Sequence, residues 1–112
     1  DFISGAGTGG TLMGLSEFIT SKSIVSSLVH RVIQVAPQED AKSHGIQGIN
    51  DGKDFLLDRG KIPEQILVST ETAIREAQDF AKTHGLLIGI SSGANLAASR
   101  AYLQKNLHRK VL

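Results

Sequence analysis

The sequence lacks cysteine and tryptophan, and only 4% of its 112 residues are aromatic. Without cysteine the chain has no disulfide, no thiolate zinc site and no thiol nucleophile. This composition is compatible with a reducing compartment. No apolar run approaches the roughly 20 residues of a membrane span, and no basic segment followed by an apolar one opens the chain. We therefore expect a cytoplasmic protein with no membrane partner.

A large charge of one sign is also missing. The formal net charge is +1, from 12 Lys and Arg against 11 Asp and Glu, and neither sign gathers into a block. This balance argues against a nucleic-acid partner. His30, His84 and His108 do not have ligand spacing, so we expect no metal site. With 40% hydrophobic residues, the chain has the composition of one small globular unit of modest stability.

The order of apolar and glycine-bearing segments predicts alternating strands and helices. We expect a strand end at Phe2 and Ile3, a glycine bend and a helix to about Ser21, and we expect residues 38–52 to be loop. The later elements are strands at 29–35, 65–68 and 86–90, and helices running from Ser69 to Gly85 and over 94–104. Such alternation predicts an α/β fold, a three-layer mostly parallel sheet with helices on both faces. Both termini resemble strand segments, so we expect residues 1–112 to be part of a larger domain.

The first bend has the composition of an anion site. It reads Gly7-Thr8-Gly9-Gly10-Thr11. Glycines let the backbone approach a ligand, and the free N–H groups at a helix start attract negative charge. The threonine hydroxyls add two donors, so a phosphate could be held without lysine or arginine. The same bend also fits a dinucleotide fingerprint, but the acidic residue expected at the end of the second strand comes only after Pro37, at Glu39 and Asp40.

A second bend contains Ser91 and Ser92, followed by Gly93. We expect it to join the strand at 86–90 to the last helix and to present a hydroxyl at the carboxyl edge of the sheet, where ligands of α/β proteins bind. Helix capping is the alternative role for these serines.

The two bends in this order, with the segment 44–49 (His-Gly-Ile-Gln-Gly-Ile) between them, resemble the fold type II pyridoxal-phosphate enzymes. Within that class they are most similar to the cysteine synthase and cystathionine β-synthase group, whose phosphate bend has the same spelling. The resemblance covers essentially the whole chain, and it implies that these residues form the C-terminal, cofactor-binding part of the large domain.

The resemblance implies a role for each of these residues. The cofactor would be pyridoxal 5'-phosphate, with its phosphate held by Gly7, Thr8, Gly9, Gly10 and Thr11. Ser91 would bond the pyridine nitrogen, and a neutral hydroxyl there suits β-elimination better than transamination. Gly48 would line the substrate side. Asn50 stands where the family usually has glycine and would narrow the entrance, whereas His44 is expected to be structural.

The activity implied is β-replacement, in which an amino acid such as O-acetylserine or serine loses its β-substituent and sulfide or a thiol forms a new C–S bond. The family also implies a homodimer. The family's Schiff-base lysine precedes the phosphate bend, and no lysine of this chain matches its motif, so we expect no catalytic residue here and no turnover by the 112 residues alone. Cystathionine β-synthase, a nicotinamide-dinucleotide module and a non-catalytic relic of the fold remain the alternatives.

Overall fold

The computed structural model describes residues 1–22, 31–50 and 55–112. Its elements in chain order are β1 (Phe2–Gly5), α1 (Gly10–Ser21), β2 (Val32–Pro37), β3 (Gln65–Val68), α3 (Thr70–His84) and α4 (Ile90–Lys105). The strands form one sheet in the order β1-β2-β3, and both pairings are parallel. The predicted α/β class with a parallel sheet is confirmed.

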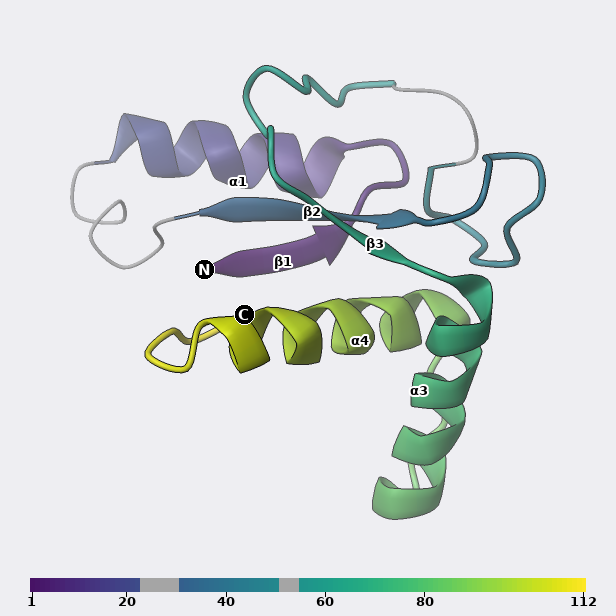
Figure 1. The fold of residues 1–112 in the computed structure, drawn as a ribbon. Helices are drawn as coiled ribbons and strands as arrows, with labels where there is room; N and C mark the ends of the chain where they lie inside the picture. Colours follow the sequence, from purple (N-terminus) through teal and green to yellow (C-terminus); the bar gives the residue numbers. More distant parts are fainter. Residues whose placement is uncertain (23–30, 51–54) are drawn as a thin grey trace.

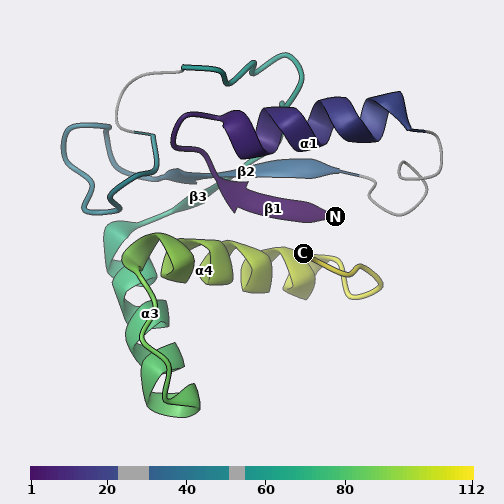
Figure 2. The same ribbon diagram turned by 180° about the vertical axis from the view of Figure 1, so that it is seen from behind.

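The sheet lies between two helices, α1 on one face and α4 on the other (Figures 1 and 2). Each face has its own apolar cluster. The α1 side contains Ala6, Leu12, Met13 and Ile62. The α4 side is larger and includes Ile33, Val35, Ile49, Ala94 and Ala98. The three-layer arrangement is therefore the predicted one, while α3 projects away from the sheet at one end.

Strand β2 forms the centre of the sheet and begins later than expected. Residues 29 and 30 of the strand predicted at 29–35 lie outside the described residues, and the strand observed runs from Val32 to Pro37. Proline has no N–H to donate, so it is suited to the last position of a strand. The next residue, Gln38, donates its N–H to the Val68 carbonyl at 3.0 Å.

Helix α3 follows the sequence signals at both ends. The Ser69 hydroxyl accepts from the Thr72 N–H, which caps the first turn, and Gly85 ends the helix in the left-handed conformation with φ 70°. Serine at the N-cap and glycine after the C-terminus are the residues these two positions favour. The predicted boundaries of this helix are confirmed.

The strand predicted at 86–90 does not form. Residues 86–89 have no regular structure, Leu87 is 95% exposed, and α4 begins at Ile90. A short apolar run cannot be distinguished from a connection by periodicity alone. The glycine taken for part of a bend, Gly93, lies inside α4, where a β-carbon would collide with the Ala73 carbonyl of α3. It is a packing glycine at a close helix crossing.

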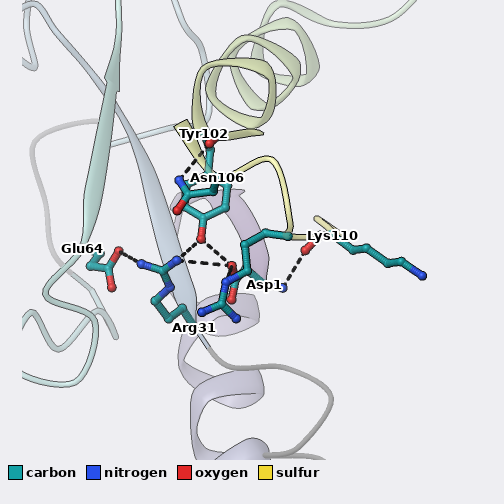
Figure 3. A network of polar contacts seen from close by, with 7 residues as sticks. Asp1, Arg31, Glu64, Tyr102, Asn106 and Lys110 are labelled. Atoms are coloured by element: carbon teal, nitrogen blue, oxygen red, sulfur yellow. Dashed lines mark hydrogen bonds and ion pairs between the residues drawn. The ribbon is translucent and has the colours of Figure 1, made fainter. Parts of the chain in front are cut away.

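Polar side chains tie together the amino ends of the three strands and the end of α4 (Figure 3). Tyr102 donates its hydroxyl to the buried Asp1 carboxylate and accepts from Arg31. The other end of the Arg31 guanidinium lies 3.4 Å from Glu64. Each strand is directly preceded by one residue of this network, namely Asp1, Arg31 or Glu64. The network therefore holds the amino ends of the strands together and leaves their carboxyl ends for other contacts.

The end of the chain pairs with the free edge of β1. The Ile3 N–H donates to the Leu112 carbonyl, and the Leu112 N–H donates to the Asp1 carbonyl, both at 3.0 Å. This alternation is that of a parallel ladder, so the strand beginning expected at this end is present as a single paired residue. Among the described helices, none has the length and hydropathy to cross a membrane.

Candidate functional site

The glycine bend lies at the carboxyl edge of the sheet, between β1 and α1. It lines a small hollow of about 50 Å³, bounded by Gly5, Leu12 and the five residues of the sequence motif. Because about 10 to 15 Å³ of such space holds one water, the hollow admits a group of several atoms. The bend is therefore open to solvent rather than collapsed on its own side chains.

Helix α1 begins without a side-chain cap in the described part of the chain. Its N-cap residue, Gly9, is left-handed with φ 87°. The Thr8 hydroxyl makes only a long contact of 3.4 Å with the Gly10 N–H. First-turn N–H groups without an intrahelical partner, together with the helix dipole, favour a bound anion. The bend therefore offers uncommitted donors at its hollow.

Three glycines in and beside the bend lie close to other segments of the chain. A β-carbon on Gly7 would lie 2.6 Å from the Gly48 carbonyl oxygen, and one on Gly9 would lie 2.8 Å from the Leu57 nitrogen. At Gly5 it would collide with the Ile49 side chain. The missing β-carbons thus make room for neighbouring loops at these three positions, and the approach of a ligand to the same bend stays a prediction.

Residues 44–50, hereafter the 44–50 loop, cover one side of the bend. The Asn50 N–H donates to the Ala6 carbonyl at 2.8 Å, and the Ile49 side chain is buried. Gly48 and Asn50 are both left-handed, with φ 80° and 51°. Asparagine is among the few residues other than glycine that tolerate this conformation.

Glu39 caps α3 and does not face the bend. Its carboxylate accepts from the Thr70 N–H at 2.7 Å, and this backbone bond is the main reason that the pKa of Glu39 lies below its ordinary value. The acidic residue that the dinucleotide alternative would need at the end of the second strand is therefore already engaged at a helix start.

Ser91 lies in the first turn of α4, half-buried, and not in a bend after a strand. The N-cap of α4 is Gly89, and no described side chain caps the helix, so the capping alternative for Ser91 and Ser92 is wrong. The contact that joins α4 to the bend comes from Asn95, whose side-chain oxygen accepts from the Gly5 N–H at 2.9 Å. The sequence alone gives Asn95 no role, because its only signal is that asparagine is a poor helix former and stands near the start of a helix.

The donor set of this site suits a phosphate. Within residues 1–22, 31–50 and 55–112, no group of three or more His, Asp or Glu gathers to hold a metal ion. The bend instead offers N–H groups, the exposed Thr8 and Thr11 side chains and a helix N-terminus, which bind charged oxygens. The fold and site thus define an α/β protein with an uncapped, hollowed glycine bend at the carboxyl edge of a parallel sheet.

Comparison with known proteins gives the family. The model of the pyridoxal-phosphate dependent enzymes matches residues 1–112, so the chain belongs to this family. The family's cofactor carries a phosphate group, and the uncapped, hollowed bend fits it. Membership also removes the dinucleotide-binding alternative.

Several proteins to which the chain is similar are named cysteine synthases. The chain is 39% identical to cysteine synthase B of Campylobacter jejuni over 99% of its length and 36% identical to cysteine synthase A of Escherichia coli over 88%. A solved cysteine synthase from Entamoeba histolytica superposes with a TM-score of 0.78 at 28% identity, over 99% of this chain and 35% of that one. The chain spans only 38% and 34% of the two curated relatives.

Proposed function

We propose that the chain is the phosphate-binding part of a pyridoxal-phosphate enzyme of the cysteine synthase type, which exchanges the β-substituent of an amino acid for sulfur. The observation that carries this proposal is the hollow at the uncapped start of α1, in a chain whose whole length matches the family. The chemistry of β-replacement comes from the cofactor, which withdraws electrons from the amino acid when bound.

We assign each residue of the proposed site a role. Gly7, Thr8, Gly9, Gly10 and Thr11 hold the phosphate through N–H groups and hydroxyls. Ser91 places a neutral hydroxyl against the pyridine nitrogen, supported by its freedom from any capping bond. Asn95 keeps the start of α4 beside the bend through its bond to the Gly5 N–H.

The substrate side is assigned to the 44–50 loop. Its Gly48 carbonyl lies against Gly7, so the loop and the bend are in direct contact. Asn50 adds a side chain where the family usually has none, and we expect it to narrow the entrance for the amino-acid substrate.

The remaining parts of the proposal concern the whole protein. O-acetylserine or serine is the expected donor, sulfide or a thiol the nucleophile, a homodimer the assembly and the cytoplasm the compartment. No lysine of these 112 residues is assigned to the cofactor, so the chain alone is expected to have no turnover.

Cofactor binding by the full-length protein tests the proposal. Thr8→Val and Thr11→Val each remove one hydroxyl donor to a charged oxygen, and the dissociation constant for pyridoxal phosphate should rise roughly tenfold or more for each. Thr20→Val, on the same helix but away from the bend, should leave it unchanged; its hydroxyl bonds the Ser16 carbonyl. A full-length protein that takes up no pyridoxal phosphate, or that binds it equally well in all three variants, would overturn the proposal.

Cystathionine β-synthase activity is a second candidate, because the chain is also 34% identical to the O-acetylserine dependent cystathionine beta-synthase of Bacillus subtilis. The two activities differ in the nucleophile. Product formation from O-acetylserine with sulfide, compared with an amino-acid thiol, decides between them.

A further inference from the structure

His44 stands at the start of the 44–50 loop, and both of its ring nitrogens are used within that loop. Nδ1 accepts from the Ile46 N–H at 3.2 Å, and Nε2 lies 3.3 Å from the Asn50 carbonyl oxygen. The imidazole therefore bridges the first and last turns of the loop, six residues apart in sequence.

These two contacts define one form of the ring. A backbone N–H can only donate, so Nδ1 must be unprotonated, and a carbonyl can only accept, so Nε2 must carry the proton. Both bonds therefore form together only in the Nε2–H tautomer. Neither nitrogen is left to exchange a proton with a substrate while both bonds hold.

The loop that His44 bridges lies between two fixed elements. On one side the Gly45 N–H donates to the Thr70 hydroxyl at 2.9 Å, at the start of α3. On the other side Asn50 donates its N–H to Ala6, at the beginning of the bend. His44 thus sets the span of a segment that connects α3 to the bend.

We propose that His44 is a positioning residue, which holds the 44–50 loop in its substrate-binding shape against the glycine bend through the two ring nitrogens. The inference rests on the proposed function, in which this loop meets the amino-acid substrate. His44 acts on Asn50, whose backbone is left-handed. Two bonds fix this conformation: the Asn50 carbonyl accepts from His44, and the Asn50 N–H donates to the Ala6 carbonyl.

Substitutions separate the two bonds. His44→Asn keeps an oxygen that can accept from the N–H two residues ahead, as in an Asx-turn, and loses the Asn50 contact. His44→Gln places an amide donor close to the position that Nε2 has in the wild type, so it can keep the Asn50 contact, and it loses the Ile46 contact. His44→Ala loses both. His108 is exposed and outside the site, so His108→Asn and His108→Gln are matched controls.

The first readout is hydrogen exchange of the 44–50 amides in the full-length protein, with and without pyridoxal phosphate. Exchange should be faster in His44→Ala than in the wild type, intermediate in His44→Asn and His44→Gln, and unchanged in both His108 variants. Because this readout does not depend on the cofactor, it is informative even if the wild type binds none; failure to bind would count against the proposed function alone.

The second readout is the division between KM and kcat. Each lost bond should raise KM for the amino-acid donor roughly threefold to tenfold while kcat is nearly unchanged, since a misplaced loop weakens ground-state and transition-state binding alike. Unchanged exchange and KM in all three variants would overturn the proposal, and so would faster exchange throughout the protein with no change in KM. If His44→Ala does not fold, the Asn and Gln variants carry the test.

Discussion

Replacing Gly7 by alanine tests the packing of the bend directly. The added β-carbon would lie 2.6 Å from the Gly48 carbonyl oxygen. A carbon–oxygen contact needs about 3.3 Å, so the bend and the 44–50 loop must separate by about 0.7 Å. The obstacle is a backbone atom, and its loop is held by the Asn50 bond to Ala6, so no side-chain rotation relieves it.

The magnitude follows from two opposing effects. Overpacking of this kind costs about 1–3 kcal/mol, whereas the loss of glycine's freedom in the unfolded chain returns about 0.4–1 kcal/mol. We expect Gly7→Ala to lower the free energy of unfolding by about 1–2 kcal/mol. The dissociation constant for pyridoxal phosphate should rise as well, because Gly7 lines the hollow.

Urea unfolding followed by circular dichroism measures the first effect, with Gly14→Ala as the matched control. Gly14 lies in α1, and a β-carbon there meets no atom within 4 Å. The same chemical change should therefore stabilise the protein by about 0.5–1 kcal/mol. A Gly7→Ala variant at least as stable as the wild type would show that the bend and the 44–50 loop are not tightly packed at this position.

Three further predictions concern other contacts. Tyr102→Phe removes the hydroxyl that bonds the buried Asp1 carboxylate and should lower the free energy of unfolding by about 1.5–3 kcal/mol; a smaller loss in urea titration would show that water replaces it. Asn95→Ala leaves the Gly5 N–H without its acceptor and should cost about 1–3 kcal/mol and weaken cofactor binding, whereas Asn95→Asp, which keeps an oxygen, should cost less. The pKa of Glu39 is lowered by the backbone N–H it accepts at the start of α3; wild type should therefore exceed Glu39→Gln in stability at neutral pH, and this advantage should disappear as the pH falls below about 4.3 and through the lowered value. An advantage that persists in acid would contradict this assignment.

The parts of the fold that sequence predicted well are those with local causes. The strand Gln65–Val68, the Ser69 cap and the left-handed Gly85 were all predicted at the positions observed. Each depends on residues within a few positions, so the chemistry of the segment suffices. The same holds for the bend that precedes α1.

The errors have tertiary causes. The segment 86–90 has strand-like composition, yet it connects α3 to α4 and pairs with no strand of the described sheet. Gly93 looked like part of a bend, but a helix crossing requires it. The contact between Asn95 and Gly5 joins residues 90 positions apart. Only the packed structure brings such partners together.

In the candidate site, too, the features with local causes were predicted and those with tertiary causes were missed. The motif was found from its glycines and threonines, and the structure forms it into one hollow. A second reason for the glycines was missed, because the atoms that would crowd a β-carbon on Gly7 or Gly9 belong to Gly48 and Leu57, far away in sequence. Glycine-rich bends indicate close approach, and the sequence alone does not say whether chain or ligand approaches.

A crystal structure of the full-length protein loaded with pyridoxal phosphate would show which residues hold the phosphate. We expect phosphate oxygens within about 2.7–3.2 Å of N–H groups at the start of α1, with the Thr8 or Thr11 hydroxyl as a further donor. A phosphate bound by other residues, with the hollow at this bend filled only by water, would contradict this expectation.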